Sequence, residues 1–297
     1  MRQRTNIMSY PLAGFVRLLA HLPLWALYLL ADFLYFLMNY VFAYRKTVIM
    51  GNLRRSFPEK SEQELNHIRK GFYRHLADVA AETVKLLTIK DSEVIRRCEF
   101  DPEGKALMLE YFDNNRSFIG LLGHFGNWEW VPPMVTLNLP FPVIPVYRPM
   151  RDKVIDRLLL SIRGRYTYEL VNKNTVGRQM IRYNRMDKPY ILGLIADQTP
   201  PVSGSYSTTF LSQETLVFGG PEKLARSFKM PVFFVALRKK KRGHYYLHTE
   251  LLTEKPWELA EGELSQLFMS RLEREIRAMP SFWLWSHRRW KRRKFAD

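Results

Sequence analysis

The sequence lacks the residues that build disulfides or cysteine-ligated metal centres. Its 297 residues include a single cysteine, Cys98, so no intramolecular disulfide can form. No CxxC pair or Cys/His cluster has the spacing of a structural zinc site. Folding therefore does not require an oxidising compartment. Cys98 lies in the segment RRCEF, where a packing role is expected.

Acidic residues are scarce relative to basic ones. Lys and Arg number 46 against 29 Asp and Glu, which gives a formal net charge of +17. This excess is larger than solubility requires and indicates a polyanionic partner. The candidates are nucleic acid, an anionic membrane or phosphorylated lipid, and an acidic protein. Apolar residues make up 46% of the chain, which is enough for a packed core.

The chain also lacks internal repeats and low-complexity linkers, and its clearest shift in composition lies near the N-terminus. Residues 12–44 are dominated by Leu, Phe, Tyr, Ala, Trp and Val, and 22–44 exceed the ~20 residues that cross a hydrocarbon core. Large aromatic residues continue into Arg45 without a small-residue cleavage site. We therefore expect an uncleaved membrane anchor over residues 1–46, which spans the bilayer or lies on it. The interrupting residues are Pro23, Asp32 and Asn39. The alternative is a buried helical hairpin of a soluble domain.

Residues 47–297 are expected to form one domain of the α/β class. Short apolar runs predict strands at 117–122, 143–147, 190–196, 232–237 and 244–252. Helical patterns separate them at 61–86, 101–114, 151–165, 174–186, 220–229 and 257–279, the first opened by a capping box at Ser61 to Glu64. This alternation predicts a mostly parallel sheet flanked by helices.

The best candidate for chemistry is His124, which follows the first of these strands in LLGHFGNWEW. Open α/β sheets place their ligand-contacting loops at such strand ends. Glu129 follows about one helical turn later, so both side chains could face one pocket. A neutral imidazole can take a hydroxyl proton on one nitrogen while a carboxylate holds the hydrogen of the other. The alternative is a loop histidine bonded to a backbone carbonyl, with Glu129 on a solvated helix face.

Several sequence segments are similar to those of one known family. The chain resembles the bacterial lipid A biosynthesis late acyltransferases of the lysophospholipid acyltransferase superfamily, whose H-x-x-x-x-D/E hallmark matches His124 and Glu129. Residues 199–201, Thr-Pro-Pro, depart from the segment that often follows ADQ in the family, which leaves acceptor and acyl-chain preference open. Besides the aromatic anchor, the similar segments are NLRRSFPE at 52–59, GHFGNWE at 123–129, VYRP at 146–149, ADQTP at 196–200, GPEKLAR at 220–226 and WLWSHRRWK at 283–291.

The resemblance implies an acyltransferase that joins an acyl chain to a hydroxyl of a lipid A precursor. His124 would deprotonate the hydroxyl, and Glu129 would orient the base. No metal or organic cofactor is expected, because an acyl thioester supplies the driving force. Segment 215–223, in which Gly219-Gly220-Pro221 predicts a loop leading into a helix, would help to form a wall of the acyl pocket. The implied substrate-binding residues are Asn127, Arg148, Asp197 and Gln198. The last two follow the predicted strand 190–196, at the carboxyl edge of the sheet.

The expected partners are a thioester donor on acyl carrier protein or coenzyme A, and an anionic lipid acceptor. The expected location is the inner membrane of a Gram-negative bacterium, with domain 47–297 on the cytoplasmic face. The basic, aromatic segment 283–294 is interpreted as meeting lipid headgroups or an acidic carrier protein.

Three other interpretations remain open. The acceptor could be a lysophospholipid, an aminoacyl lipid or a mannosylated phosphoinositide. A different class of protein, a membrane-tethered nucleic-acid binder, could use segment 283–294, although no nucleic acid is expected as a partner. A membrane adaptor with a degenerate acyltransferase domain is disfavoured because both His124 and Glu129 are present.

Overall fold

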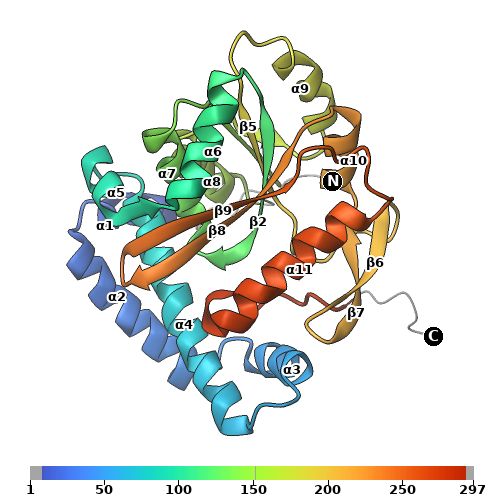
Figure 1. Ribbon diagram of the computed structural model, residues 1–297. Coiled ribbons are helices and arrows are strands. Elements are labelled where there is room, and N and C mark those ends of the chain that lie inside the picture. Colours follow the sequence, from blue (N-terminus) through green and yellow to red (C-terminus); the bar gives the residue numbers. More distant parts are fainter. Residues whose placement is uncertain (1–8, 151, 292–297) are drawn as a thin grey trace.

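A seven-stranded sheet forms the centre of the computed structural model, which describes residues 9–150 and 152–291 (Figure 1). Neighbouring strands are parallel except for the antiparallel β8–β9 pair. The prediction of an α/β fold with a mostly parallel sheet is confirmed. In spatial order the strands are β1 (Cys98–Phe100), β9 (His244–Thr253), β8 (Val232–Lys241), β2 (Phe118–Gly126), β5 (Ile191–Ile195), β3 (Val143–Tyr147) and β4 (Val171–Asn172).

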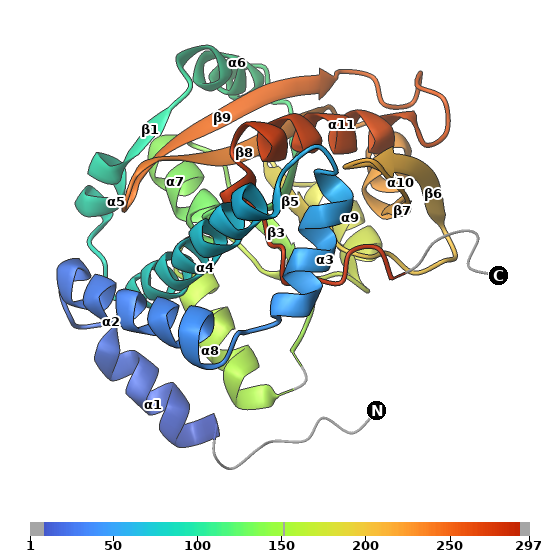
Figure 2. The ribbon, with the colours of Figure 1, turned by 90° about the horizontal axis from the view of Figure 1, so that it is seen from below.

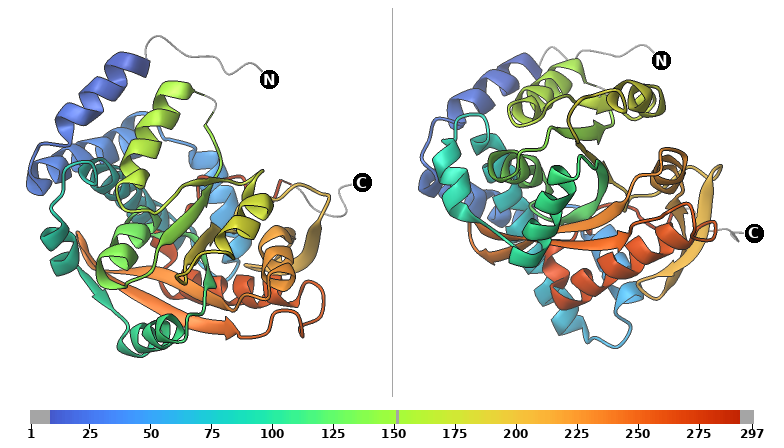
Figure 3. Two further views of the ribbon diagram at one scale, coloured as in Figure 1. Left: turned by 90° about the horizontal axis from the view of Figure 1, so that it is seen from above. Right: turned by 45° about the horizontal axis from the view of Figure 1, so that its top comes forward.

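Helices cover both faces of this sheet, because its central strands are apolar on both sides. In β2, Ile119 and Leu121 pack into one core with α4 and α11, while Phe118 and Leu122 pack into another with α6, α7 and α8 (Figure 3). The helices of this domain are α3 (Lys46–Ser56), α4 (Glu62–Lys85), α5 (Asp91–Arg97), α6 (Pro102–Asp113), α7 (Val131–Asn138), α8 (Lys153–Gly164), α9 (Val176–Tyr183), α10 (Gly220–Ser227) and α11 (Glu263–Ala278), with short 3₁₀ turns η2 (Trp128–Trp130) and η3 (Pro280–Phe282).

The predicted start of α4 is confirmed. The Ser61 side chain accepts a hydrogen bond from the Glu64 backbone N–H, and the Glu64 carboxylate accepts one from the Ser61 N–H. This capping box pairs two backbone donors that would otherwise lack partners at the helix end.

The prediction that segment 215–223 is a loop leading into a helix is wrong in its first half. Residues 215–218 belong to β7 (Gln213–Phe218), which pairs with β6 (Ser205–Phe210) in a separate antiparallel hairpin. The turn consists of Leu211 and Ser212, both with positive φ. Hairpin turns of this kind usually carry Gly or Asn, so Leu211 and Ser212 do not predict a turn from sequence.

The N-terminal apolar segment forms α1 (Ser9–Leu19), α2 (Leu24–Phe36) and a π-helical turn, η1 (Leu37–Val41). Residues Leu24–Val41 are long and apolar enough to cross a membrane, by length and composition. In the structure α1 lies along α8, and α2 lies along α4 (Figure 2). Ala31 packs into one of the two cores beside the sheet, and Leu24 packs into the other. The division into an anchor at 1–46 and a domain at 47–297 stays a prediction.

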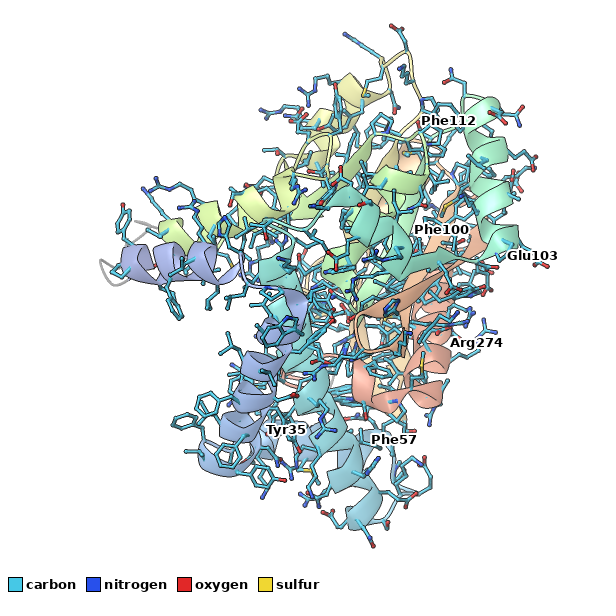
Figure 4. All side chains as sticks on the ribbon, turned by 90° about the vertical axis from the view of Figure 1, so that its left-hand side faces the viewer. Tyr35, Phe57, Phe100, Glu103, Phe112 and Arg274 are labelled. Carbon is cyan, nitrogen blue, oxygen red and sulfur yellow. The ribbon has the colours of Figure 1, made fainter. Side chains whose placement is uncertain are left out.

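Polar contacts also hold α2 against the rest of the protein. The Tyr28 hydroxyl donates to Glu82 of α4 at 2.9 Å, and Asp32 forms an ion pair with Arg242 at 2.8 Å. On the opposite side, many side chains of α1 and α2 project away from the molecule, and Tyr35 marks the position of α2 in Figure 4. This outer surface, called the aromatic face below, exposes Tyr10, Leu12, Phe15, Leu18, Trp25, Leu29, Leu30, Phe33, Phe36, Tyr40, Val41 and Phe42.

Candidate active site

His124 lies near the carboxyl end of β2, in the segment where two glycines allow close backbone approach. A Cβ on Gly123 would lie 3.3 Å from the Asp197 carboxylate and 2.8 Å from the Leu272 side chain. Gly126 has φ +59°, and a Cβ there would lie 1.7 Å from the backbone oxygen of Leu237 in β8. Both glycines are therefore needed for the local path of the chain.

The His124 ring is bonded to Asp197, which follows the neighbouring strand β5. Its Nδ1 lies 2.7 Å from Asp197 Oδ1, and the His124 backbone N–H donates to Asp197 Oδ2 at 2.8 Å. Because β2 and β5 are parallel neighbours, their carboxyl ends lie at the same edge of the sheet. With Nδ1 donating to the carboxylate, Nε2 is left with the lone pair that a base requires.

A third donor reaches the same carboxylate from the C-terminal part of the chain. The indole Nε1–H of Trp283 donates to Asp197 Oδ2 at 2.8 Å, and the Asp197 side chain is 2% exposed. Burial by itself raises the pKa of Asp197. The nearby His124 and the hydrogen bonds from His124 and Trp283 outweigh burial, so the pKa of Asp197 is lowered. This carboxylate is therefore ionised in the folded protein at neutral pH.

Glu129 does not hold the His124 ring, contrary to the expectation from sequence. It lies in η2 and forms an ion pair with Arg163 of α8, whose Nε and Nη2 donate to its two oxygens at 2.9 and 2.6 Å. Trp128 Nε1–H donates to Glu129 at 3.1 Å, and the Trp128 ring lies edge-on to His124 at 5.1 Å between centroids. Glu129 thus reaches the imidazole only through Trp128. Burial lowers the pKa of Arg163, but bonding to Glu129 outweighs it and raises that pKa.

The other sequence candidates take different positions around His124. The Gln198 amide nitrogen lies 3.3 Å from His124 Nε2, the ring nitrogen that does not contact Asp197. Arg148 follows β3 at the same sheet edge and is exposed, and no hydrogen bond or ion pair joins it to another residue that the structure describes. Asn127 was expected to contact substrate, but its side chain is fully buried and donates to Glu82 of α4 at 2.5 Å.

The described part of the C-terminal segment 283–294 packs against this site. Trp283, Trp285, Arg289 and Trp290 are buried, which contradicts the interpretation that these residues of segment 283–294 meet headgroups, a carrier protein or nucleic acid. Arg288 is exposed, as is residue 291, whereas residues 292–294 lie outside the described residues. One sequence feature that favours burial is the dense aromatic content of WLWSHRRW.

His287 of this segment contacts the residue that follows Gln198. The Thr199 backbone N–H donates to His287 Nε2 at 3.2 Å, and the Thr199 hydroxyl donates to the backbone oxygens of Arg288 and Arg289. Burial lowers the pKa of His287 to about 4, so its imidazole is neutral at physiological pH and Nε2 can act as the acceptor. The loop after Asp197 is thus held by the C-terminal segment.

Buried Arg289 supports the β6–β7 hairpin from the same segment. Its guanidinium donates to the Thr215 hydroxyl at 2.7 Å and to the Leu216 carbonyl oxygen at 2.8 Å. Burial lowers the pKa of Arg289 to about 10, an effect that the charge of Asp197 opposes. Val217 and Phe218 of the hairpin also line a small, mostly apolar cavity with a volume of about 10 Å³, together with Leu121 and Ala196.

Together these residues form a site for proton transfer at a sheet edge. The His124 imidazole has one nitrogen bonded to an ionised carboxylate and the other facing the Gln198 amide. Such an arrangement can take a proton from a hydroxyl and stabilise the resulting imidazolium. Among residues 9–150 and 152–291, no group of three His, Cys, Asp or Glu side chains is placed to hold a metal ion.

Comparison with known proteins identifies similar sequences along almost the whole chain. The family model described as "Bacterial lipid A biosynthesis acyltransferase" matches residues 3–292. A lipid A biosynthesis palmitoleoyltransferase of Escherichia coli (strain K12) is 25% identical over 258 residues, covering 85% of this chain and 81% of that protein. A lipid A biosynthesis acyltransferase of Shigella flexneri has the same identity and coverage.

Proposed function

The chain belongs to the bacterial lipid A biosynthesis acyltransferase family and is an acyltransferase, and from this premise we propose that it acylates a hydroxyl of a lipid A precursor. The observation that carries the mechanism is the His124–Asp197 pair at the edge of the sheet, 2.7 Å between Nδ1 and Oδ1. The donor is an acyl thioester.

In the proposed reaction, His124 Nε2 takes the proton of the acceptor hydroxyl as the oxygen attacks the thioester carbonyl. An oxygen–carbon bond forms, the carbon–sulfur bond breaks, and the proton passes from the imidazolium to the leaving thiolate. Asp197 keeps the ring in the Nδ1–H tautomer and stabilises the imidazolium, the role expected of Glu129 from the sequence. General-base help of this kind is worth ~10²–10⁴-fold in rate.

Glu129 and Arg163 act as a pair beside the base. Their bidentate ion pair fixes the short turn η2, and the Trp128 indole bonded to Glu129 lies against the His124 ring. This contact limits rotation of the imidazole. Gln198, next to Nε2, is proposed to contact the reacting oxygen, and exposed Arg148 to bind an anionic group of the substrate.

The proposed donor is a carrier-protein thioester, because the +17 net charge attracts an acidic protein. Coenzyme A is also anionic, so a comparison of kcat/KM for the two donors decides between them. We propose that the hairpin β6–β7 contributes to the wall of the acyl pocket, as the resemblance of segment 215–223 to the family implies; Val217, Phe218 and Pro221 line a cavity of about 10 Å³ there.

The aromatic face is proposed to contact the cytoplasmic leaflet of the inner membrane. Trp25 is 67% exposed and Phe42 72%, large values for aromatic side chains on one surface. Helix α2 packs along α4, which carries charged residues such as Asp78 and Glu82 in ion pairs or hydrogen bonds. A spanning α2 would draw these groups into hydrocarbon or break their contacts. We therefore propose that α1, α2 and η1 lie along the membrane surface.

Lipid analysis of a deletion strain tests this function. Mass spectrometry of lipids from cells without the gene is expected to show loss of one acyl chain from lipid A, restored by the wild-type gene and not by His124→Ala. Loss of an acyl chain from a phospholipid, an aminoacyl lipid or a mannosylated phosphoinositide instead would identify one of the other acceptors. Restoration of the lipid A acyl chain by His124→Ala would show that His124 is not the base.

A further inference from the structure

The Trp283 indole is bonded to the carboxylate that holds the proposed base, although it lies 86 residues further along the chain than Asp197. We propose that Trp283 is a positioning residue for acyl transfer, which fixes the Asp197 carboxylate so that one of its oxygens faces His124 Nδ1. The inference rests on the proposed function, and neither the family description nor the named relatives assign a role to this residue.

The backbone fixes Trp283 beside β2. Phe125 and Trp283 form an antiparallel β-bridge, and the Leu284 N–H donates to the His124 carbonyl oxygen at 3.1 Å. The segment therefore pairs with the residues that carry the base. A displacement of Trp283 relative to His124 would break these backbone bonds, which makes the indole position rigid with respect to the site.

Other aromatic rings fix the rotamer of the indole. Trp283 packs edge-on against Trp285 at 4.8 Å, Trp290 at 5.9 Å and Phe210 at 5.7 Å between ring centroids, and it is 2% exposed. Rings packed in this way leave the side chain no alternative orientation. The Nε1–H therefore has one direction in which to donate.

The two carboxylate oxygens of Asp197 accept different hydrogen bonds, which explains how Trp283 orients the carboxylate. Oδ2 accepts the Trp283 indole N–H and the His124 backbone N–H, whereas Oδ1 accepts the His124 ring. Two fixed donors on Oδ2 prevent the carboxylate from rotating about its Cβ–Cγ bond. They also disperse its negative charge, so the proton stays on the imidazole when the base is charged.

Trp285 offers a matched control. It is two residues away, fully buried, and its indole N–H is also bonded, to the Pro280 carbonyl oxygen at 2.6 Å. None of the hydrogen bonds that the structure describes for the Trp285 side chain involves Asp197. Trp283→Phe and Trp285→Phe each remove one indole and one hydrogen bond from the same aromatic cluster, and they differ in whether the lost bond reached the carboxylate.

The test compares kcat, KM and the pH profile of kcat for purified wild type, Trp283→Phe and Trp285→Phe, with melting temperatures measured in parallel. Trp283→Phe is expected to lower kcat by roughly tenfold with KM within about twofold, and to move the acid limb of the profile to higher pH. Trp285→Phe keeps an aromatic ring against Trp283 and leaves the Trp283–Asp197 bond in place, so it is expected to keep the wild-type profile at a melting temperature similar to that of Trp283→Phe. Equal effects of the two variants on kcat and on the pH profile would overturn the proposal.

A second measurement does not depend on turnover. With ¹⁵N-labelled histidine, the NMR spectrum of His124, assigned with His124→Gln, is expected to show the Nδ1–H tautomer in wild type and Trp285→Phe and a mixture of tautomers in Trp283→Phe. An unchanged spectrum in Trp283→Phe would contradict the proposal. Absence of acyl transfer by wild type, with the expected spectra, would count against the proposed function and leave the role of Trp283 standing.

Discussion

His124 and Asp197 lie 73 residues apart in the sequence, and the carboxylate of the second accepts hydrogen bonds from both the ring and the backbone N–H of the first. These two hydrogen bonds fix the His124 ring and the end of β2 relative to Asp197. It results from the parallel pairing of β2 with β5, which ends both strands at one edge of the sheet.

The roles of Asp197 and Glu129 can be separated by pH. Asp197→Asn removes the charge next to the imidazole and is expected to lower kcat by ~10²–10⁴-fold and move the acid limb of its profile to lower pH. Glu129→Gln removes the charge that pairs with Arg163 and weakens the hydrogen bond from Trp128. It is expected to lower activity without moving the acid limb. Steady-state kinetics between about pH 5 and 9 measures both. A shifted limb in Glu129→Gln alone would return the orienting role to Glu129.

Burial of two histidines makes stability depend on pH. Burial lowers the folded-state pKa of His287 to about 4 and that of His75 to about 3, from an ordinary value of 6.5. The unfolded chain therefore binds more protons below pH 6.5, so this stabilisation is complete above 6.5 and is lost as the pH falls toward the folded values. We expect the melting temperature to fall between pH 6.5 and 4, measured by circular dichroism.

The variant His287→Gln isolates one of these contributions. Its amide oxygen can still accept the Thr199 N–H, but it cannot be protonated in this range. The fall in melting temperature between pH 6.5 and 4 is expected to be smaller than in wild type by ~3 °C or more. Parallel curves for the two proteins would show that His287 is not the titrating group.

The placement of the N-terminal helices can be tested with single cysteines. In a Cys98→Ala background, His21→Cys lies before α2 and Lys46→Cys lies after η1, both at exposed positions. If these helices lie along one leaflet, a membrane-impermeant maleimide labels both in inverted vesicles and neither in intact spheroplasts. Labelling of the two positions from opposite sides would show a membrane-spanning helix. Recovery of the protein in the soluble fraction would exclude membrane attachment.

Gly126 can be tested for its effect on folding. Gly126→Ala places a methyl group against the Leu237 carbonyl in a left-handed backbone conformation, and it is expected to destabilise the protein by more than about 2 kcal/mol. Gly177→Ala is the control, because a Cβ there meets nothing within 4 Å. Denaturant unfolding measures both. Equal stability of the two variants would show that β2 can adjust its path at Gly126.

The sequence located His124 at a strand end and also placed Asp197 at the carboxyl edge of the same sheet. It assigned the orienting role to Glu129 because that residue is close in sequence. In the structure, the short turn η2 directs Glu129 toward Arg163 of α8, and a residue from a neighbouring strand takes the position beside the ring. Pairing between strands, which single-sequence patterns do not specify, decided between the two carboxylates.

For segment 283–291, too, the sequence did not determine which residues it contacts. Its basic and aromatic composition is compatible with an exposed binding surface and equally with a buried cluster. Only the folded chain shows that the β-bridge from Trp283 to Phe125 and the contacts of Asn52 with the backbone oxygens of Trp285 and His287 place it in the interior. Such contacts join residues more than 150 positions apart.

What the sequence by itself determined is local: the alternation of strands and helices, the capped start of α4, the apolar N-terminal helices and the strand end that carries His124. These follow from periodicity, capping and propensity, which act over one or two turns of chain. What only the tertiary structure decided is which side chains meet at that strand end. Asp197 and Trp283 contact His124 and its carboxylate because sheet pairing and burial bring distant segments together.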